Sequence, residues 1–333
     1  MRALFLAACL ILTAACAGRP SPTLTVTVPP PPPVDSDALV RRGCYRCLEE
    51  AFTAASARGA TPQAFEAALL LVLRSKELGL PPDRWIQRAQ ALLPPGPDWA
   101  MHLEIVAAQP RDPLSADRDE LFAEGTAQRR PRAVSDAWRE TLKAGAGSPV
   151  LRAYLDLAVA CRPDTFGPAV IAVTNAAITA VVDQFGTDVP VLQYRVGLCG
   201  GREAARLAAA READPAWVDA ELELARRELN RRPRPDFDEG VRRLRVAQEA
   251  FPESPVIPAT LGAAFEGREQ WTDALAAHEA VIALVPTHRD AWLGKTVSLS
   301  SLLRFEEGRA AATRLIEMGS WNLGPAHYWR AWN

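Results

Sequence analysis

Prolines recur at a near-constant interval in the second half of this 333-residue chain. Pro215, Pro252 and Pro286 are 37 and 34 residues apart, and the stretches between them are rich in Ala, Leu, Arg and Glu. A period of this length is typical of architectures that stack one short helical unit repeatedly. A single unit cannot bury its apolar face alone, so its neighbours must cover it. The spacing therefore predicts a row of helical hairpins.

Helical periodicity extends over most of the rest of the chain. Ala67, Leu70, Leu71 and Leu78 are spaced by three, four and seven residues, which places them on one face of a helix. The segment 170–182 is rich in Val, Ile and Thr, but its length without a turn signal favours a buried helix over a strand. Hydroxyl residues that precede a proline predict three helix starts, at Thr61-Pro62, Ser148-Pro149 and Ser254-Pro255.

The repeat that ends at Pro286 carries Leu261, Gly262 and Phe265 on its expected first helix and Ala274 on its second. This pattern resembles the tetratricopeptide repeat, in which small residues stand where two helices cross closely. The resemblance implies an all-α fold, an α-α superhelix in which helical hairpins form a solenoid.

The resemblance covers about residues 187–320 specifically and is only suggestive before them. We therefore expect irregular α-helical repeats over residues 35–186 and tetratricopeptide repeats over residues 187–333, the last of them incomplete. Generic α-α repeats remain the alternative for the first of these regions.

The N-terminus resembles the signal peptide of a bacterial lipoprotein. Arg2 precedes an uncharged apolar run that is too short to span a bilayer. The run ends in small residues before Cys16, although Thr13 stands where the lipobox most often has leucine. The resemblance implies a signal peptide over residues 1–15, a lipid on Cys16 and a Pro-rich linker over residues 16–34. It places the protein in the cell envelope, as an outer-membrane lipoprotein that faces the periplasm; the alternative is an ordinary signal peptide and a soluble periplasmic product.

Four further cysteines lie in the body, and an even number in an oxidising compartment suggests disulfides. Cys44 and Cys47 have the spacing that redox enzymes use, but no strand and helix alternate around them as in thioredoxin-like folds. Leu48 stands where covalent haem attachment needs histidine. Cys161 and Cys199 are expected at the ends of helices in neighbouring hairpins. Disulfides within these two pairs and packed free thiols both remain open.

Motifs of common enzymes are missing from the sequence, including the Gly-rich phosphate loop, the Gly-x-Ser-x-Gly elbow and the His-Glu-x-x-His helix. The four histidines form no metal-ligand spacing with the cysteines, and His278 falls at a packing position of the repeat. A formal net charge of −2 argues against nonspecific binding of nucleic acid. We therefore expect a binding protein that is not an enzyme and holds no metal or cofactor.

Tetratricopeptide proteins bind their ligands on the concave face that successive first helices line, and the resemblance implies the same groove here. Its expected residues mix charged and apolar side chains, which suits an extended peptide or a helix. They are Asp219, Leu222, Arg226, Asn230, Ala259, Glu266, Asp290 and Leu293.

The expected partner is a protein or peptide, and the membrane is contacted only through the lipid on Cys16. These expectations describe a lipid-anchored envelope scaffold. The alternatives are a periplasmic thiol or redox protein that uses Cys44 and Cys47, and a small-molecule carrier with a pocket in the N-terminal half.

The C-terminal segment 325–333 reads as the first helix of a further repeat, with Tyr328, Trp329 and Trp332 at packing positions. A first helix without its second would leave these rings uncovered. Three outcomes are open: the chain continues in its natural form, the rings mediate self-association, or the helix folds them back onto the preceding hairpin.

Overall fold

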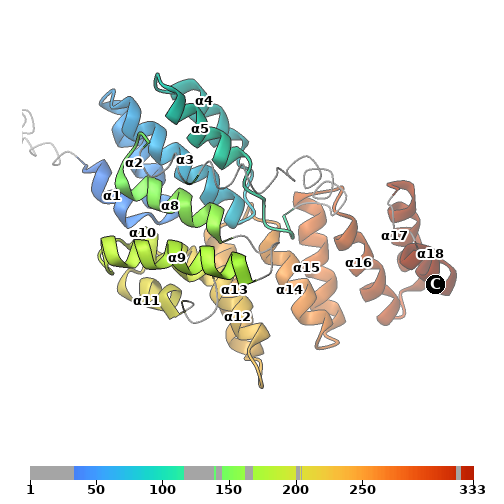
Figure 1. Ribbon diagram of the computed structural model, residues 1–333. Helices are drawn as coiled ribbons and strands as arrows, with labels where there is room; N and C mark the ends of the chain where they lie inside the picture. Colours follow the sequence, from blue (N-terminus) through green and yellow to red (C-terminus); the bar gives the residue numbers. More distant parts are fainter. Residues whose placement is uncertain are drawn as a thin grey trace, which may run out of the picture. The chain divides into compact units, whose positions relative to one another are not determined.

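The computed structural model describes residues 34–115, 139, 145–161, 168–199, 203, 205–319 and 324–333. These residues form sixteen α-helices and no strand, which confirms the predicted all-α class (Figure 1). Residues Asp35–Asn333 form one compact unit. The predicted signal peptide, the lipidated Cys16 and the linker up to residue 33 lie outside the described residues. Within the described part of the chain, no helix is long and apolar enough to cross a bilayer.

Helices in the first half are mostly separated by short turns. They are α1 (Ser36–Arg42), α2 (Tyr45–Ala57), α3 (Thr61–Glu77), α4 (Asp83–Leu92), α5 (Pro97–Ala107), α8 (Pro149–Ala160) and α9 (Pro168–Phe185). The second half contains α10 (Pro190–Leu198), α11 (Ala205–Ala213), α12 (Ala220–Asn230), α13 (Phe237–Ala250), α14 (Val256–Glu266), α15 (Trp271–Leu284), α16 (Arg289–Ser301), α17 (Phe305–Glu317) and α18 (Gly324–Trp332).

One of the three predicted helix starts is capped as expected. The Ser148 hydroxyl accepts a hydrogen bond from the Leu151 N–H at 3.1 Å, and a proline follows it in the first turn of α8. At the start of α14 the Ser254 hydroxyl instead donates to the Leu78 carbonyl at 2.6 Å. Thr61 lies inside α3, and the residue before it offers no side-chain cap. The serine at α14 thus serves a tertiary contact, which the local sequence could not reveal.

The helix α9 confirms the predicted helicity of segment 170–182 but not its burial. Among its described side chains only Ala177 and Val181 are buried, and Ile171 is 60% exposed. The described contacts of α9 are mainly with α8. Its composition suits a buried helix, but the described residues around it bury only one side.

Consecutive helices from α12 to α17 pack as neighbouring pairs. The helix α12 packs on α13, α14 on α15 and α16 on α17, while α12 also contacts α14 and α14 contacts α16 (Figure 1). The residues Gly262 and Gly294 lie on either side of the buried His278 ring of α15. A Cβ atom at Gly262 would approach the ring to 2.7 Å, so only glycine permits this separation of the helices. The expected packing roles of Gly262 and His278 are confirmed.

A buried charged cluster joins the two halves of the unit. The Arg74 side chain on α3 is fully buried, and its guanidinium donates to Asp219 and Glu77 at 2.6 Å each. It lies 3.7 Å from the centre of the Tyr194 ring on α10. Burial alone lowers the pKa of Arg74, but the surrounding phenol and carboxylate groups outweigh it and raise the pKa well above its ordinary value. The cluster therefore keeps a charged Arg74 in the core and ties α3 to α10 and to the start of α12.

Candidate functional site: the side of α12, α14 and α16

The first two residues of the predicted groove lie in the core. Asp219 and Leu222 are each 3% exposed. Asp219 accepts hydrogen bonds from Arg74 and from the backbone N–H of Tyr45, both at 2.6 Å. Its partners stand about 145 and 174 positions away in the sequence, so the repeat pattern gave no sign of them. The start of α12 is therefore covered by the N-terminal helices and offers no open groove.

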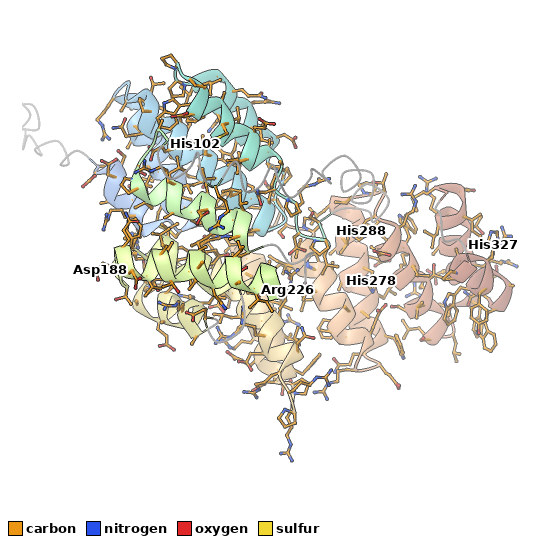
Figure 2. The ribbon with its side chains drawn as sticks, viewed as in Figure 1. His102, Asp188, Arg226, His278, His288 and His327 are labelled. Atoms are coloured by element: carbon orange, nitrogen blue, oxygen red, sulfur yellow. A yellow bond between two sulfur atoms is a disulfide. The ribbon has the colours of Figure 1, made fainter. Side chains whose placement is uncertain are left out.

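The next predicted groove residue, Arg226, binds a non-helical segment of the same chain. This segment, residues Gln109–Ser115, follows α5 and is called the strap here. The Arg226 guanidinium forms a two-pronged ion pair with Asp112, with N–O distances of 2.6 and 3.1 Å. Arg226 and His288 are labelled in Figure 2. Two hydrogen bonds between one guanidinium and one carboxylate fix the orientation of the carboxylate and also compensate its charge.

Further contacts fix both ends of the strap. The Nε2 atom of His288, just before α16, lies 3.3 Å from the Leu114 carbonyl oxygen. The Lys76 ammonium of α3 donates to the carbonyls of Val106, Ala107 and Gln109 at 2.6 to 3.2 Å. The strap thus passes from α3 across α12 to the start of α16. The sequence did not point to Asp112 or Leu114, because both lie in a non-helical segment that carries no motif.

Electrostatics favour the charged form of Arg226. Burial by itself lowers the pKa of its guanidinium, but Asp112 and Glu223 outweigh this effect and raise the pKa above its ordinary value. The Asp112 side chain is only 6% exposed, so little water competes for the pair. This side of α12 can therefore hold a carboxylate firmly.

The remaining predicted groove residues differ in accessibility. The Oε1 atom of Glu266 on α14 lies 2.9 Å from Nε2 of His278 on α15, so this carboxylate contacts the neighbouring helix. Asn230 is exposed at the end of α12, and its amide donates to the Arg226 carbonyl at 2.8 Å. The others are half-buried and comprise Ala259 on α14 and Asp290 and Leu293 on α16. The accessible part of the predicted groove is therefore confined mainly to α14 and α16.

Both cysteine pairs form disulfides, Cys44–Cys47 and Cys161–Cys199. Cys44 occupies the N-cap position of α2, so the first pair lies at a helix N-terminus, as in many thiol enzymes. However, Cys44 and Cys47 are only 1% and 4% exposed. A thiolate must reach a sulfur atom to exchange with the bond, so this burial favours a structural role.

Other candidate chemistry is limited. In the described ranges, no group of three or more His, Cys, Asp or Glu residues could hold a metal ion. His102 is fully buried, and burial lowers its pKa to about 4. Neither of its ring nitrogens has a hydrogen-bond partner among the described residues.

The C-terminal helix α18 exposes most of its aromatic surface. It packs on α16 and α17, but only Ala326 among its residues is buried. Tyr328 and Trp332 are 56% and 65% exposed and stack on each other with ring centres 6.1 Å apart. Trp329 is half-buried and meets Tyr328 edge to face at 5.3 Å. Self-association through these rings stays a prediction.

Comparisons with known proteins add no relative. No protein-family model matches the sequence, and no curated protein matches it significantly. What this chain does must therefore be inferred from its fold and its side chains.

Proposed function

We propose that this chain is a lipid-anchored binding protein of the bacterial cell envelope. It is anchored through Cys16 and holds a peptide segment of a protein partner on the side of α14 and α16. It belongs, on this proposal, to the helical-repeat scaffolds that resemble tetratricopeptide proteins, and it catalyses no reaction.

The observation that supports this proposal is the strap. A non-helical stretch of chain already lies against α12 and the start of α16, where Arg226 binds its Asp112 carboxylate and His288 its Leu114 carbonyl. Side chains on α12 and at the N-cap of α16 therefore bind both a side-chain charge and a backbone carbonyl. These are the two kinds of contact that a groove needs in order to hold a peptide.

Beyond the strap, the same side of the helices remains accessible. Ala263 on α14 is exposed, and Leu293 and Val297 on α16 are half-buried. These residues would contact an apolar side chain of the partner. On this proposal they occupy the repeat positions on α14 and α16 that correspond to Arg226 and its neighbours on α12.

A matched pair of substitutions tests the proposal. Ala263→Glu places a charge on the proposed surface, whereas Ala276→Glu places the same charge on an exposed position of α15. Partner capture from detergent-solubilised envelopes should fall for Ala263→Glu and stay unchanged for Ala276→Glu. Equal capture by both variants would refute the proposed surface.

The anchor requires a separate test. Cys16→Ser should move the protein from the membrane fraction to the soluble periplasmic fraction and abolish labelling by a fatty-acid precursor. Unchanged membrane association of this variant would refute the anchor without touching the binding surface.

A further inference from the structure

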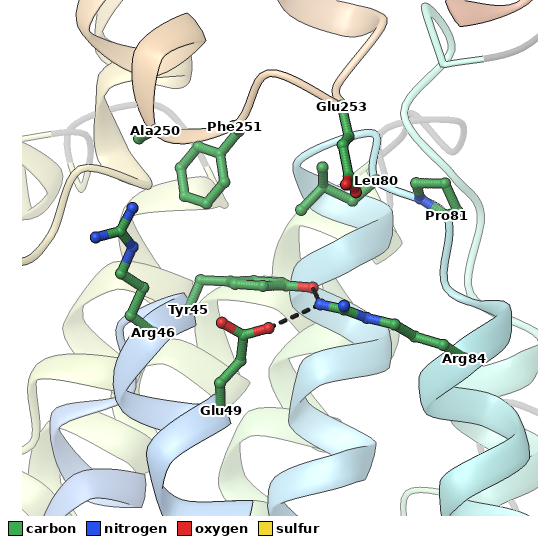
Figure 3. A pocket seen from close by; sticks show the side chains of 9 residues that line it. All are labelled: Tyr45, Arg46, Glu49, Leu80, Pro81, Arg84, Ala250, Phe251 and Glu253. Atoms are coloured by element: carbon green, nitrogen blue, oxygen red, sulfur yellow. Dashed lines mark hydrogen bonds and ion pairs between the residues drawn. The ribbon is translucent and has the colours of Figure 1, made fainter.

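A pocket of about 280 Å³ lies away from the proposed binding surface (Figure 3). It opens between the start of α2, the turn from α3 to α4, and the turn from α13 to α14. Its lining residues are Tyr45, Arg46, Glu49, Leu80, Pro81, Arg84, Ala250, Phe251 and Glu253.

The Tyr45 ring in the pocket is held by contacts with several neighbouring side chains. The Tyr45 and Phe251 rings meet edge to face with centres 5.8 Å apart. The Tyr45 hydroxyl lies 3.0 Å from both the Trp85 indole nitrogen and the Ser75 hydroxyl. Arg84 also donates to it at 3.4 Å. A ligand that packs on this ring therefore need not order it, which lowers that part of the entropic cost of binding.

The charged part of the pocket is asymmetric. On one side, the Arg84 guanidinium donates to Glu49 at 2.7 Å, and Glu253 lies over the same side (Figure 3). Arg46 lies on the opposite side of the Tyr45 ring (Figure 3). Among the described residues, the side chains of Arg46 and Glu253 form no hydrogen bond or ion pair, and the charge of Glu253 acts on Arg84 from a distance. One end of the pocket is therefore positive, and the other carries one excess negative charge.

The Cys44–Cys47 disulfide supports the same pocket. Tyr45 and Arg46 are the two residues between the bonded cysteines, so the bond constrains the backbone of the turn that carries both. Tyr45 is held further by its backbone hydrogen bond to Asp219. The pair of cysteines thus has a positioning role that needs no redox chemistry.

We propose that this pocket is a second peptide-binding site, specific for an apolar side chain flanked by one acidic and one basic residue. The apolar side chain packs on Leu80, Pro81 and Phe251. The acidic neighbour pairs with Arg46 and the basic neighbour with Glu253, which matches the charge at each end. This site stands independently of the surface on α14 and α16.

The test uses the tripeptide acetyl-Glu-Leu-Lys-amide and the full chain, with binding followed by NMR titration. We expect saturable binding that is about fivefold weaker for acetyl-Ala-Leu-Ala-amide, because each exposed ion pair contributes modestly. Arg46→Glu and Glu253→Lys should each weaken binding of the charged peptide by a similar factor. Both residues are exposed, so neither substitution disturbs the core.

Matched controls lie on α13 outside the pocket. Arg245→Glu and Glu249→Lys reverse the same charges at exposed positions and should leave binding unchanged. Ala263→Glu should also leave it unchanged, which separates this site from the surface on α14 and α16. No saturable binding of the charged tripeptide, or equal weakening by the α13 variants, would overturn the proposal.

Discussion

Substitution of Asp219 tests whether this residue belongs to the core or to a groove. A residue on an open groove tolerates truncation, whereas Asp219 here is the acceptor for a fully buried guanidinium and for the first N–H of α2. Asp219→Ala removes this carboxylate and leaves Glu77 as the remaining ion partner of Arg74. The variant therefore leaves a buried charge only half compensated.

The expected loss is large relative to ordinary protein stability. Removing one partner of a buried pair costs about 3–5 kcal/mol, against a typical total free energy of unfolding of about 5–15 kcal/mol. Asp219→Asn keeps the shape and one acceptor oxygen, so we expect a smaller loss of about 1–3 kcal/mol. Asp219→Ala should therefore lower the free energy of unfolding more than Asp219→Asn does.

Urea unfolding measured by circular dichroism checks this ranking. Glu249→Ala, on an exposed position of α13, serves as the control and should change the free energy of unfolding by less than about 0.5 kcal/mol. If Asp219→Ala were no more destabilising than this control, Asp219 would not be part of a buried ionic cluster. It would then be better described as an accessible groove residue.

Three further predictions concern packing, pH and the disulfide. Gly294→Ala should lower the free energy of unfolding by about 1–2 kcal/mol, because its methyl group overlaps the His278 ring, and this loss should disappear in a His278→Ala background; an equal loss in both backgrounds would contradict the contact. His102 is neutral in the folded state and protonates readily when unfolded, so stability should fall by up to about 3 kcal/mol as the pH drops from about 6.5 to 4. Thermal unfolding of His102→Leu should lack this part of the pH dependence, and an unchanged profile would refute the assignment. Replacing both Cys161 and Cys199 by serine opens a loop of 38 residues and should cost about 4 kcal/mol, read from urea midpoints; a midpoint equal to that of the parent protein would contradict it.

The helical class could be predicted from the sequence because it depends on local signals. Apolar spacing and Pro-bounded segments predicted helices throughout, and the described residues contain no strand. The close crossing at Gly262 was also predictable, since a glycine at that repeat position indicates where another helix approaches. His278 was predicted to pack in the core, but the pattern did not reveal that its ring lies at this crossing.

The groove was harder to predict because it depends on contacts distant in sequence. Asp219 and Leu222 occupy repeat positions that are exposed in the resembled family, yet the N-terminal helices bury them here. Arg226 was also predicted to face an open groove, but it forms an ion pair with Asp112 of the strap. Helix α9 shows the same limit, because its apolar composition does not reveal that the described residues bury only one side of it.

The pocket at Tyr45 was missed for a similar reason. Its walls come from three separate turns, and no motif joins Arg46 to Glu253. The only local signal was the spacing of Cys44 and Cys47, which drew attention to redox chemistry and away from the two residues between them.

Site-directed photo-crosslinking tests the central claim, that a peptide of a protein partner lies along α14 and α16. A photoreactive phenylalanine replaces Ala263 or, as the control, Ala276, in the full-length protein expressed in its native cells. We predict that the probe at 263 crosslinks to one segment of one protein, and that an excess of the synthetic segment abolishes the crosslink. Failure of the probe at 263 to crosslink, or the same product from position 276, would contradict the claim.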